Sequence, residues 1–195
     1  MQLYGTARSH FTRKVRLLLD HLGHDYTLVD IGNVADADPE VFSNNPLMSV
    51  PVLRDGGVQL IESDHIAAYL VRTYDSADQY KVLTTQIEHL NARAVLNGAM
   101  AAEVRLVLAE RTGLETRTAA YFEKARRVIS NVLDWCEEQP DLFSPDTPTY
   151  LDFHFISLWD HANFYELVEG GWPRLQDLAR RLSASDLIQR SAILG

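Results

Sequence analysis

Cysteine is almost absent from this chain of 195 residues, which holds only Cys136. A single cysteine cannot form an internal disulfide, and this predicts a reducing compartment. The first 75 residues contain no cysteine, so a redox centre made of two thiols is excluded from that part of the chain. Cys136 itself falls on an apolar stripe at helical spacing with Ile129 and Val132, which favours a small buried side chain over a reactive thiol.

Long apolar runs and long basic runs are also missing. No apolar run approaches the roughly 18 residues that a membrane helix needs. Met1 leads directly into Leu3 and Tyr4 without a basic and then apolar leader, so we expect a cytoplasmic protein without a secretory signal. The 27 acidic residues outnumber the 18 basic ones, and the formal charge is −9. This balance argues against nucleic acid or an anionic membrane surface as a partner.

Residues 1–74 alternate short apolar strands with helical patterns. The expected elements, in order, are a strand at Gln2–Tyr4, a helix from Phe11 to Leu22 ended by Gly23, a strand at Tyr26–Ile31, a short irregular helix at Asp38–Phe42, a hairpin of Pro51–Arg54 and Val58–Ile61, and a helix after Ser63. Arg13 and Lys14 fall on other faces of the first helix than its apolar stripe. The resulting order, βαβαββα, combines a parallel crossover with an antiparallel hairpin and matches the thioredoxin-like α/β fold.

The rest of the chain is expected to be all-helical. Residues 76–79 form a polar linker, which divides the chain into domains at 1–75 and 80–195. Helical patterns follow from Tyr80 onward, with one long apolar seam and then a helix at about Glu115–Glu138; the seam consists of Leu83, Ile87, Leu90, Ala94, Gly98, Ala101 and Leu108. Thr149 and Asp152 form a capping box ahead of a segment that is apolar on nearly every face, which predicts the central helix of a bundle. Pro173 opens a last helix with a leucine stripe.

The segment Ser49-Val50-Pro51-Val52-Leu53 is unusual because a proline interrupts a β-branched strand pattern. A proline at a strand entrance often fixes a turn, and we predict that Pro51 follows a cis bond. Val50 would then present its N–H and C=O groups outward, where an extended peptide can pair with them as an added strand.

Glu62 and Ser63 come shortly afterwards, where the next helical pattern begins. Together with Val50-Pro51, with Asn45-Pro46 and with the segment from Ser9 to Arg16, they resemble the glutathione site of the glutathione transferase family. The layout also resembles that family, since an α/β domain precedes a helical one. The resemblance covers the whole chain, and its motifs are more specific in the first domain than in the second.

The resemblance implies which residue activates the thiol of bound glutathione. Members with a Ser-Pro-Phe start to the first helix use that serine, and Ser9-His10-Phe11 is similar, with His10 in place of the proline. Tyr4 is the rival, because other branches of the family use a tyrosine near the end of the first strand; Thr6 is a third hydroxyl in the same loop. Plain N-capping of the helix is the alternative role for Ser9.

The resemblance also implies the contacts to glutathione. Glu62 should meet the amino group of the γ-glutamyl end, Ser63 and the N–H groups of its helix should meet the carboxylate, and Val50 should pair with the cysteinyl backbone. The expected glutathione-binding residues are Phe11, Ser49, Val50, Pro51, Glu62 and Ser63. In several branches of the family a lysine precedes Val-Pro and can meet the glycyl carboxylate of glutathione, but Met48-Ser49 stands in that place here. Binding of the glycyl carboxylate is therefore expected to depend on Asn45, Ser49 and Arg8 or Arg13.

The seven histidines show no metal-ligand spacing, so no metal site is expected. His154 and His161 lie in the proposed central helix, where hydrogen-bonded buried histidines are the simpler interpretation. Four residues of that region could line a pocket for an apolar co-substrate, although packing explains each of them equally: Trp159, His161, Phe164 and Tyr165.

The resemblance therefore implies a cytoplasmic, homodimeric, detoxifying transferase that adds the thiolate of glutathione to a small electrophile, with peroxide reduction as a side activity. No cofactor beyond glutathione is needed. A non-enzymatic binding or regulatory protein of the same fold is the alternative, since the lysine is missing and His10 departs from the family pattern. A glutathione-dependent thiol reductase is disfavoured because no cysteine lies near position 9.

Overall fold

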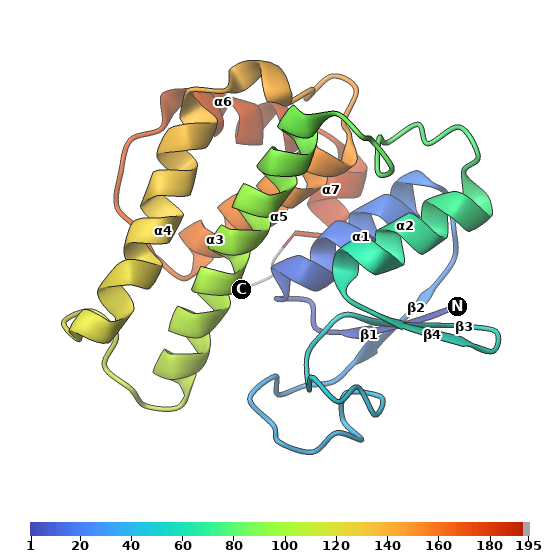
Figure 1. Ribbon diagram of the computed structural model, residues 1–195, viewed down its shortest axis with the longest axis horizontal. Helices are drawn as coiled ribbons and strands as arrows, with labels where there is room; N and C mark the ends of the chain where they lie inside the picture. Colours follow the sequence, from blue (N-terminus) through green and yellow to red (C-terminus); the bar gives the residue numbers. More distant parts are fainter. Residues whose placement is uncertain (193–195) are drawn as a thin grey trace.

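The computed structural model describes residues 1–192, beginning with a four-stranded sheet of order β2-β1-β3-β4. The strands are β1 (Gln2–Gly5), β2 (Thr27–Asp30), β3 (Val52–Asp55) and β4 (Val58–Ile61). β1 and β2 run parallel, whereas β1 with β3 and β3 with β4 run antiparallel. Helices α1 (His10–His21) and α2 (Ser63–Tyr74) cover one face of the sheet (Figure 1). The expected thioredoxin-like arrangement is confirmed.

One expected element of this unit is wrong. Residues 39–44 form successive turns, and no helix is present at 38–42, so the order is βαβββα. The backbone N–H groups of Val41 and Phe42 bond back three residues, to Asp38 and Pro39. Ser43 and Asn44 then adopt positive φ of 58° and 60°, which a right-handed helix does not admit.

The remainder of the described chain is helical, as expected. Its elements are α3 (Ile87–Arg111), α4 (Ala120–Glu137), the 3-10 turn η1 (Pro140–Leu142), α5 (Tyr150–Phe164), α6 (Pro173–Leu182) and α7 (Asp186–Arg190). α3 and α4 lie antiparallel, side by side, at the edge away from the sheet (Figure 1). α3 begins at Ile87 and α4 at Ala120, whereas the sequence pattern predicts helical structure from Tyr80 and from about Glu115. The short elements η1 and α7 were not expected.

α5 is the central helix that the sequence predicts. The capping box is formed, with the Thr149 N–H donating to the Asp152 carboxylate at 2.8 Å. The helix is buried around most of its circumference, including Phe153, Phe155 and His154, none of which exposes any surface. α5 packs against α1 and α3, so it holds the helical part of the chain against the first unit.

The apolar seam expected on α3 lies largely on its exposed face, and that prediction is wrong. Ile87 is 68% exposed and Leu90 42% exposed. The buried face instead carries Leu96, Met100 and the acidic residue Glu103. Because both faces of α3 are rich in small and apolar residues, periodicity alone did not distinguish them.

The buried stripe on α4 matches the sequence, and Cys136 is fully buried within it. Burial raises the pKa of its thiol to about 12, which fits a packing residue. Across residues 1–192, no helix combines the length and the apolar character that crossing a bilayer requires.

Candidate functional site

A cavity of about 650 Å³ opens where the sheet unit meets α3. The loop after β1, the start of α1, the loop before β3 and the start of α2 form one side, and α3 forms the other. Its lining includes the preferred activating serine and all six expected glutathione-binding residues, namely Ser9, Phe11, Ser49, Val50, Pro51, Glu62 and Ser63. Residues from four separate segments of the first unit therefore converge on one hollow.

Ser9 is the N-cap of α1, and its Oγ accepts a hydrogen bond from the Thr12 N–H at 3.1 Å. The capping role thus exists, but it uses only the oxygen of the hydroxyl as an acceptor. A serine hydroxyl keeps one O–H donor while it caps. At the positive end of α1, Ser9 can therefore cap the helix and donate to an anion in the cavity at the same time.

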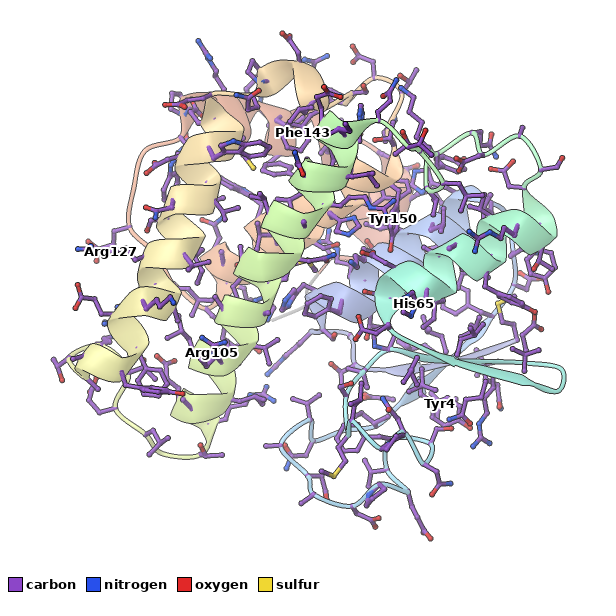
Figure 2. The ribbon with its side chains drawn as sticks, in the orientation of Figure 1. Tyr4, His65, Arg105, Arg127, Phe143 and Tyr150 are labelled. Carbon is purple, nitrogen blue, oxygen red and sulfur yellow. The ribbon has the colours of Figure 1, made fainter. Side chains whose placement is uncertain are left out.

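The rival hydroxyl of Tyr4 lies elsewhere. Tyr4 is the third residue of β1, pairs with Val29 and Val52, and does not line the cavity. Figure 2 shows it on the side of the sheet away from the helices, and its ring packs under the Arg54 guanidinium at 5.4 Å. Thr6 does line the cavity, and its Oγ1 accepts a hydrogen bond from the Ser9 N–H.

The peptide bond between Val50 and Pro51 is cis, as predicted. β3 begins only at Val52, and within residues 1–192 no backbone hydrogen bond involves Val50. The carbonyl of the preceding Ser49 is held by the Asn45 amide at 2.8 Å, which fixes the loop. Val50 is therefore an edge with a free donor and a free acceptor, and it faces the cavity.

Glu62 is the N-cap residue of α2 and adopts φ 70°, a left-handed conformation that a non-glycine residue rarely takes. Such strain costs of order 1–3 kcal/mol and is typical of functional sites. The Glu62 side chain is exposed and makes no capping bond, so the first N–H groups of α2 remain available. Ser63 is 2% exposed at the cavity wall. The arrangement offers a carboxylate for an ammonium group beside a helix N-terminus for a carboxylate.

Behind this helix start lies a buried network that the sequence analysis missed. Lys14 is fully buried, and its ammonium bonds Asp64 Oδ1 at 2.9 Å, Asn97 Oδ1 at 2.8 Å and His154 Nε2 at 2.6 Å. The Tyr150 hydroxyl also donates to Asp64 at 3.1 Å. Because Asp64 follows Ser63 directly, this network fixes the start of α2 to α1, α3 and α5. Tyr150 is labelled at that junction (Figure 2).

Burial and the neighbouring charges shift the pKa values of the network. Burial lowers the pKa of Lys14 to about 8, opposed by Asp64. Burial and Lys14 lower the pKa of His154 to about 4, so its ring is neutral at pH 7. Burial alone raises the pKa of Asp64, but His154 and Lys14 outweigh it and hold that pKa far below its usual range. The network therefore contains one ion pair at neutral pH, between the buried Lys14 and the partly exposed Asp64.

Of the residues proposed to bind the glycyl carboxylate, some line the cavity and others do not. Arg13 is 1% exposed and is bound to Asp160 at 2.7 Å, so it is not at the cavity, and that suggestion is wrong. Asn45 is buried against the Ser49 loop. Arg8 lines the cavity, is exposed, and lies over the Phe164 ring at 5.6 Å. Of the candidates, Arg8 is the cation positioned to meet a ligand.

The α3 side of the cavity is mostly apolar. It presents Ala101, Val104, Val107 and Leu108, with Arg111 at the end of the helix. Of the four residues in and just after α5 that were suggested for a co-substrate, His161 lines the cavity and the other three do not. The α3 residues carried no sequence signal beyond helical hydrophobicity, so only the fold identifies them.

A second buried cluster lies in the wall of the same cavity. Glu103 Oε2 is 2.7 Å from His161 Nδ1 and 3.9 Å from His10 Nε2. Burial raises the pKa of Glu103 and lowers that of His161 to about 3. These three residues belong to three different helices and share no local spacing, so the sequence alone does not indicate that they meet.

Comparisons with known proteins agree with this geometry. Residues 3–78 match the family model described as the glutathione S-transferase N-terminal domain. Glutathione S-transferase 4 of Zea mays is 31% identical over 174 residues, which cover 84% of this chain and 74% of the maize protein.

Solved structures extend the similarity over both units. A glutathione S-transferase of Methylobacterium radiotolerans in complex with glutathione sulfonate gives a TM-score of 0.81 at 23% identity, covering 100% of this chain and 95% of that one. A glutathione S-transferase of Methylobacillus flagellatus with glutathione bound gives a TM-score of 0.81 at 19% identity, covering 99% of both chains. At these identities the structures establish the shared fold.

Proposed function

This chain belongs to the glutathione S-transferase family, and from that membership and the cavity we propose that it binds glutathione and transfers its sulfur to an electrophilic carbon. The observation that carries the proposal is the convergence of Ser9, Val50 and Glu62 on one cavity. A hydroxyl donor, an unpaired strand edge and a carboxylate beside a helix start match the sulfur, the backbone and the γ-glutamyl end of the tripeptide. Family membership favours this enzyme over the non-enzymatic alternative.

The chemistry begins with ionisation of the bound thiol, since the thiolate is the nucleophile. A free thiol has a pKa near 8.5, and lowering it by two units requires about 2.7 kcal/mol of preference for the anion. The Ser9 hydroxyl and the N-terminus of α1 supply favourable interactions at the sulfur. The thiol proton leaves to solvent, the sulfur lone pair forms the C–S bond, and the electrons of the broken bond leave with the displaced group or enter the adjacent double bond.

The co-substrate would occupy the α3 side of the cavity. An apolar wall of Val104, Val107 and Leu108 suits a hydrophobic body, and Arg111 suits an anionic or polar group at its end. The chemistry described requires no group beyond glutathione itself.

A homodimer is also part of the proposal. The exposed apolar face of α3, with Ile87 at 68% and Leu90 at 42% exposure, has no partner within residues 1–192 and would be covered by a second copy. The lone buried thiol of Cys136 supports a reducing compartment such as the cytoplasm. Sedimentation of wild type against an Ile87→Glu variant tests the dimer.

The decisive experiment replaces the two rival hydroxyls. Ser9→Ala should raise the pKa of bound glutathione and lower turnover at neutral pH by roughly 10- to 1000-fold, with glutathione affinity largely kept, because the hydroxyl acts on the developing thiolate. Tyr4→Phe is the matched control and should keep activity, because Tyr4 lies outside the cavity. Thiolate absorbance and conjugation rates with a panel of electrophiles measure both effects.

Two results would contradict parts of this proposal. Full activity of Ser9→Ala with loss in Tyr4→Phe would assign the chain to the tyrosine-using branch. A wild-type protein that retains glutathione without any thiolate absorbance, and is inactive with every electrophile, would restore the binding-protein alternative.

A further inference from the structure

The cluster of His10, Glu103 and His161 brings together three metal-ligating side chains from α1, α3 and α5. The exposures are 1%, 0% and 5%, and one donor atom of each residue lies within 4.8 Å of those of the other two. Glu103 Oε2 lies 2.7 Å from His161 Nδ1 and 3.9 Å from His10 Nε2. Ligand atoms around tetrahedral zinc lie about 3.3 Å apart, given bonds of about 2.0–2.1 Å, so these spacings fall on either side of that value.

The cluster is incompletely bonded as a hydrogen-bond network. Glu103 Oε1 and His10 Nδ1 are buried without a hydrogen-bond partner in the described part of the chain. Across the same residues no lysine or arginine forms an ion pair with Glu103. The two histidines are the only titratable groups of the described chain within ion-pair distance of its carboxylate. A buried carboxylate without a cation is costly, so it either takes up a proton or binds a cation.

The position of the cluster leaves room for a further ligand. His10 and His161 both line the cavity, whereas Glu103 lies behind them. Two imidazoles and one carboxylate with one open position are the ligand set of catalytic zinc sites. This set prefers zinc or a similar transition metal over magnesium or calcium, which favour all-oxygen coordination.

We propose that His10, Glu103 and His161 bind one divalent transition-metal ion of the zinc type, with its open coordination position facing the cavity. Binding replaces the Glu103–His161 hydrogen bond and the 3.0 Å hydrogen bond that His10 Nε2–H donates to the Met100 carbonyl by metal–ligand bonds. The proton of His10 Nε2 moves to the unpartnered Nδ1, and the proton between Glu103 and His161 is displaced from that bond, because a ligating ring nitrogen is deprotonated. The metal ligands differ from the proposed glutathione contacts at Ser9, Val50 and Glu62, although both sets belong to the same cavity.

The test uses the full chain freed of metal with a chelator. Zn²⁺ should bind at one equivalent per chain in competition with a chromophoric chelator and should raise the melting temperature, whereas Mg²⁺ at the same concentration should not. Co²⁺ should give the visible absorption of a four-coordinate nitrogen and oxygen site. Absence of saturable Zn²⁺ binding and of the Co²⁺ spectrum would overturn the proposal.

Variants locate the ion. Glu103→Gln keeps the shape of the side chain and should weaken Zn²⁺ binding by more than about 100-fold, since loss of an outer-shell partner alone costs about 10- to 100-fold. His161→Gln should do the same and serves if Glu103→Gln fails to fold. His65→Gln removes an exposed imidazole on α2 and should keep wild-type affinity (Figure 2). Wild-type affinity in both cluster variants, or its loss in His65→Gln, would contradict the assignment.

Discussion

Two buried polar clusters lie within one helix turn of each other along α1, and they differ in how fully they are bonded. The Lys14 ammonium directs its bonds to three acceptors, on Asp64, Asn97 and His154. The cluster around Glu103 has one short contact to His161 and leaves two buried polar atoms without partners in the described residues. Both draw on α1, α3 and α5, so the elements that carry them are shared.

The difference separates a structural network from a site. A fully satisfied network fixes the geometry of its elements, and removal of one member leaves a buried charge exposed to a low dielectric. An incompletely satisfied cluster gains little from its internal contacts, and it can gain from a ligand. The four predictions below test this distinction, in order of decreasing effect.

Lys14→Met should destabilise the protein by about 3–5 kcal/mol, because Asp64 and Asn97 lose the cation that binds them. Urea unfolding of the metal-free protein measures the change. Lys124→Met, at an exposed position of α4, is the control and should change the free energy of unfolding by less than about 0.5 kcal/mol. Equal small effects at both positions would show that the Lys14 network is not a stabilising unit.

Acidification should weaken the protein through His154. Its pKa falls from 6.5 to about 4 on folding, so the unfolded chain takes up the proton first as the pH drops. The free energy of unfolding is therefore unaffected by this group above pH 6.5. It falls by at most about 3 kcal/mol as the pH drops from 6.5 to about 4.

The comparison of wild type with His154→Gln over pH 4–7 isolates this loss from that of other groups. The variant should show a flatter acid limb in urea unfolding, while His65→Gln should follow the wild type. Parallel curves for wild type and His154→Gln would mean that the His154 pKa does not change on folding, which would contradict the lowered native pKa.

Glu62→Gln should weaken glutathione binding by about 1–3 kcal/mol, because the ammonium group loses a charged partner. Stability should change little, since the side chain is exposed and makes no bond at the start of α2. Calorimetric titration and urea unfolding on one sample separate ligand binding from the network behind it. Unchanged affinity would mean that the γ-glutamyl end lies elsewhere.

Glu103→Gln should change the stability of the metal-free protein least, by about 1 kcal/mol or less. A neutral amide can hydrogen-bond His161 without the cost of a buried carboxylate. A loss as large as that of Lys14→Met would show that Glu103 is a full structural partner, and that the two clusters do not differ in kind.

Features set by neighbouring residues could be predicted from the sequence. Pro51 after Val50, the tight turn between β3 and β4 and the capping box of Thr149 each depend on residues within a few positions. Their structures were predicted correctly, including the cis bond and the start of α5. The candidate glutathione residues were named from the family resemblance, and the structure brings them together at one cavity.

Features set by residues distant in sequence could not be predicted. Helical spacing put Lys14 off the apolar stripe, and nothing local shows that Asn97 and His154 would surround it. The same holds for Glu103, which lies on the buried face of α3, while the apolar Ile87 is exposed. Polarity along one helix does not state which face a neighbouring helix covers, and that is decided only when the units pack.

The hydrogen bonds of Arg13 join the first helix to residues that are synthesised much later. Its guanidinium bonds the Ile156 carbonyl, Asp160 and Ser191, which lie 143, 147 and 178 positions later. At roughly 5–20 residues per second of synthesis, α1 leaves the ribosome on the order of ten seconds before the first of these partners exists. During that interval the Arg13 guanidinium of the nascent first unit remains in water, because none of its three hydrogen-bond acceptors has been synthesised. The contacts that bury this side chain therefore form only after α5 and the segment that ends at Ser191 have been synthesised.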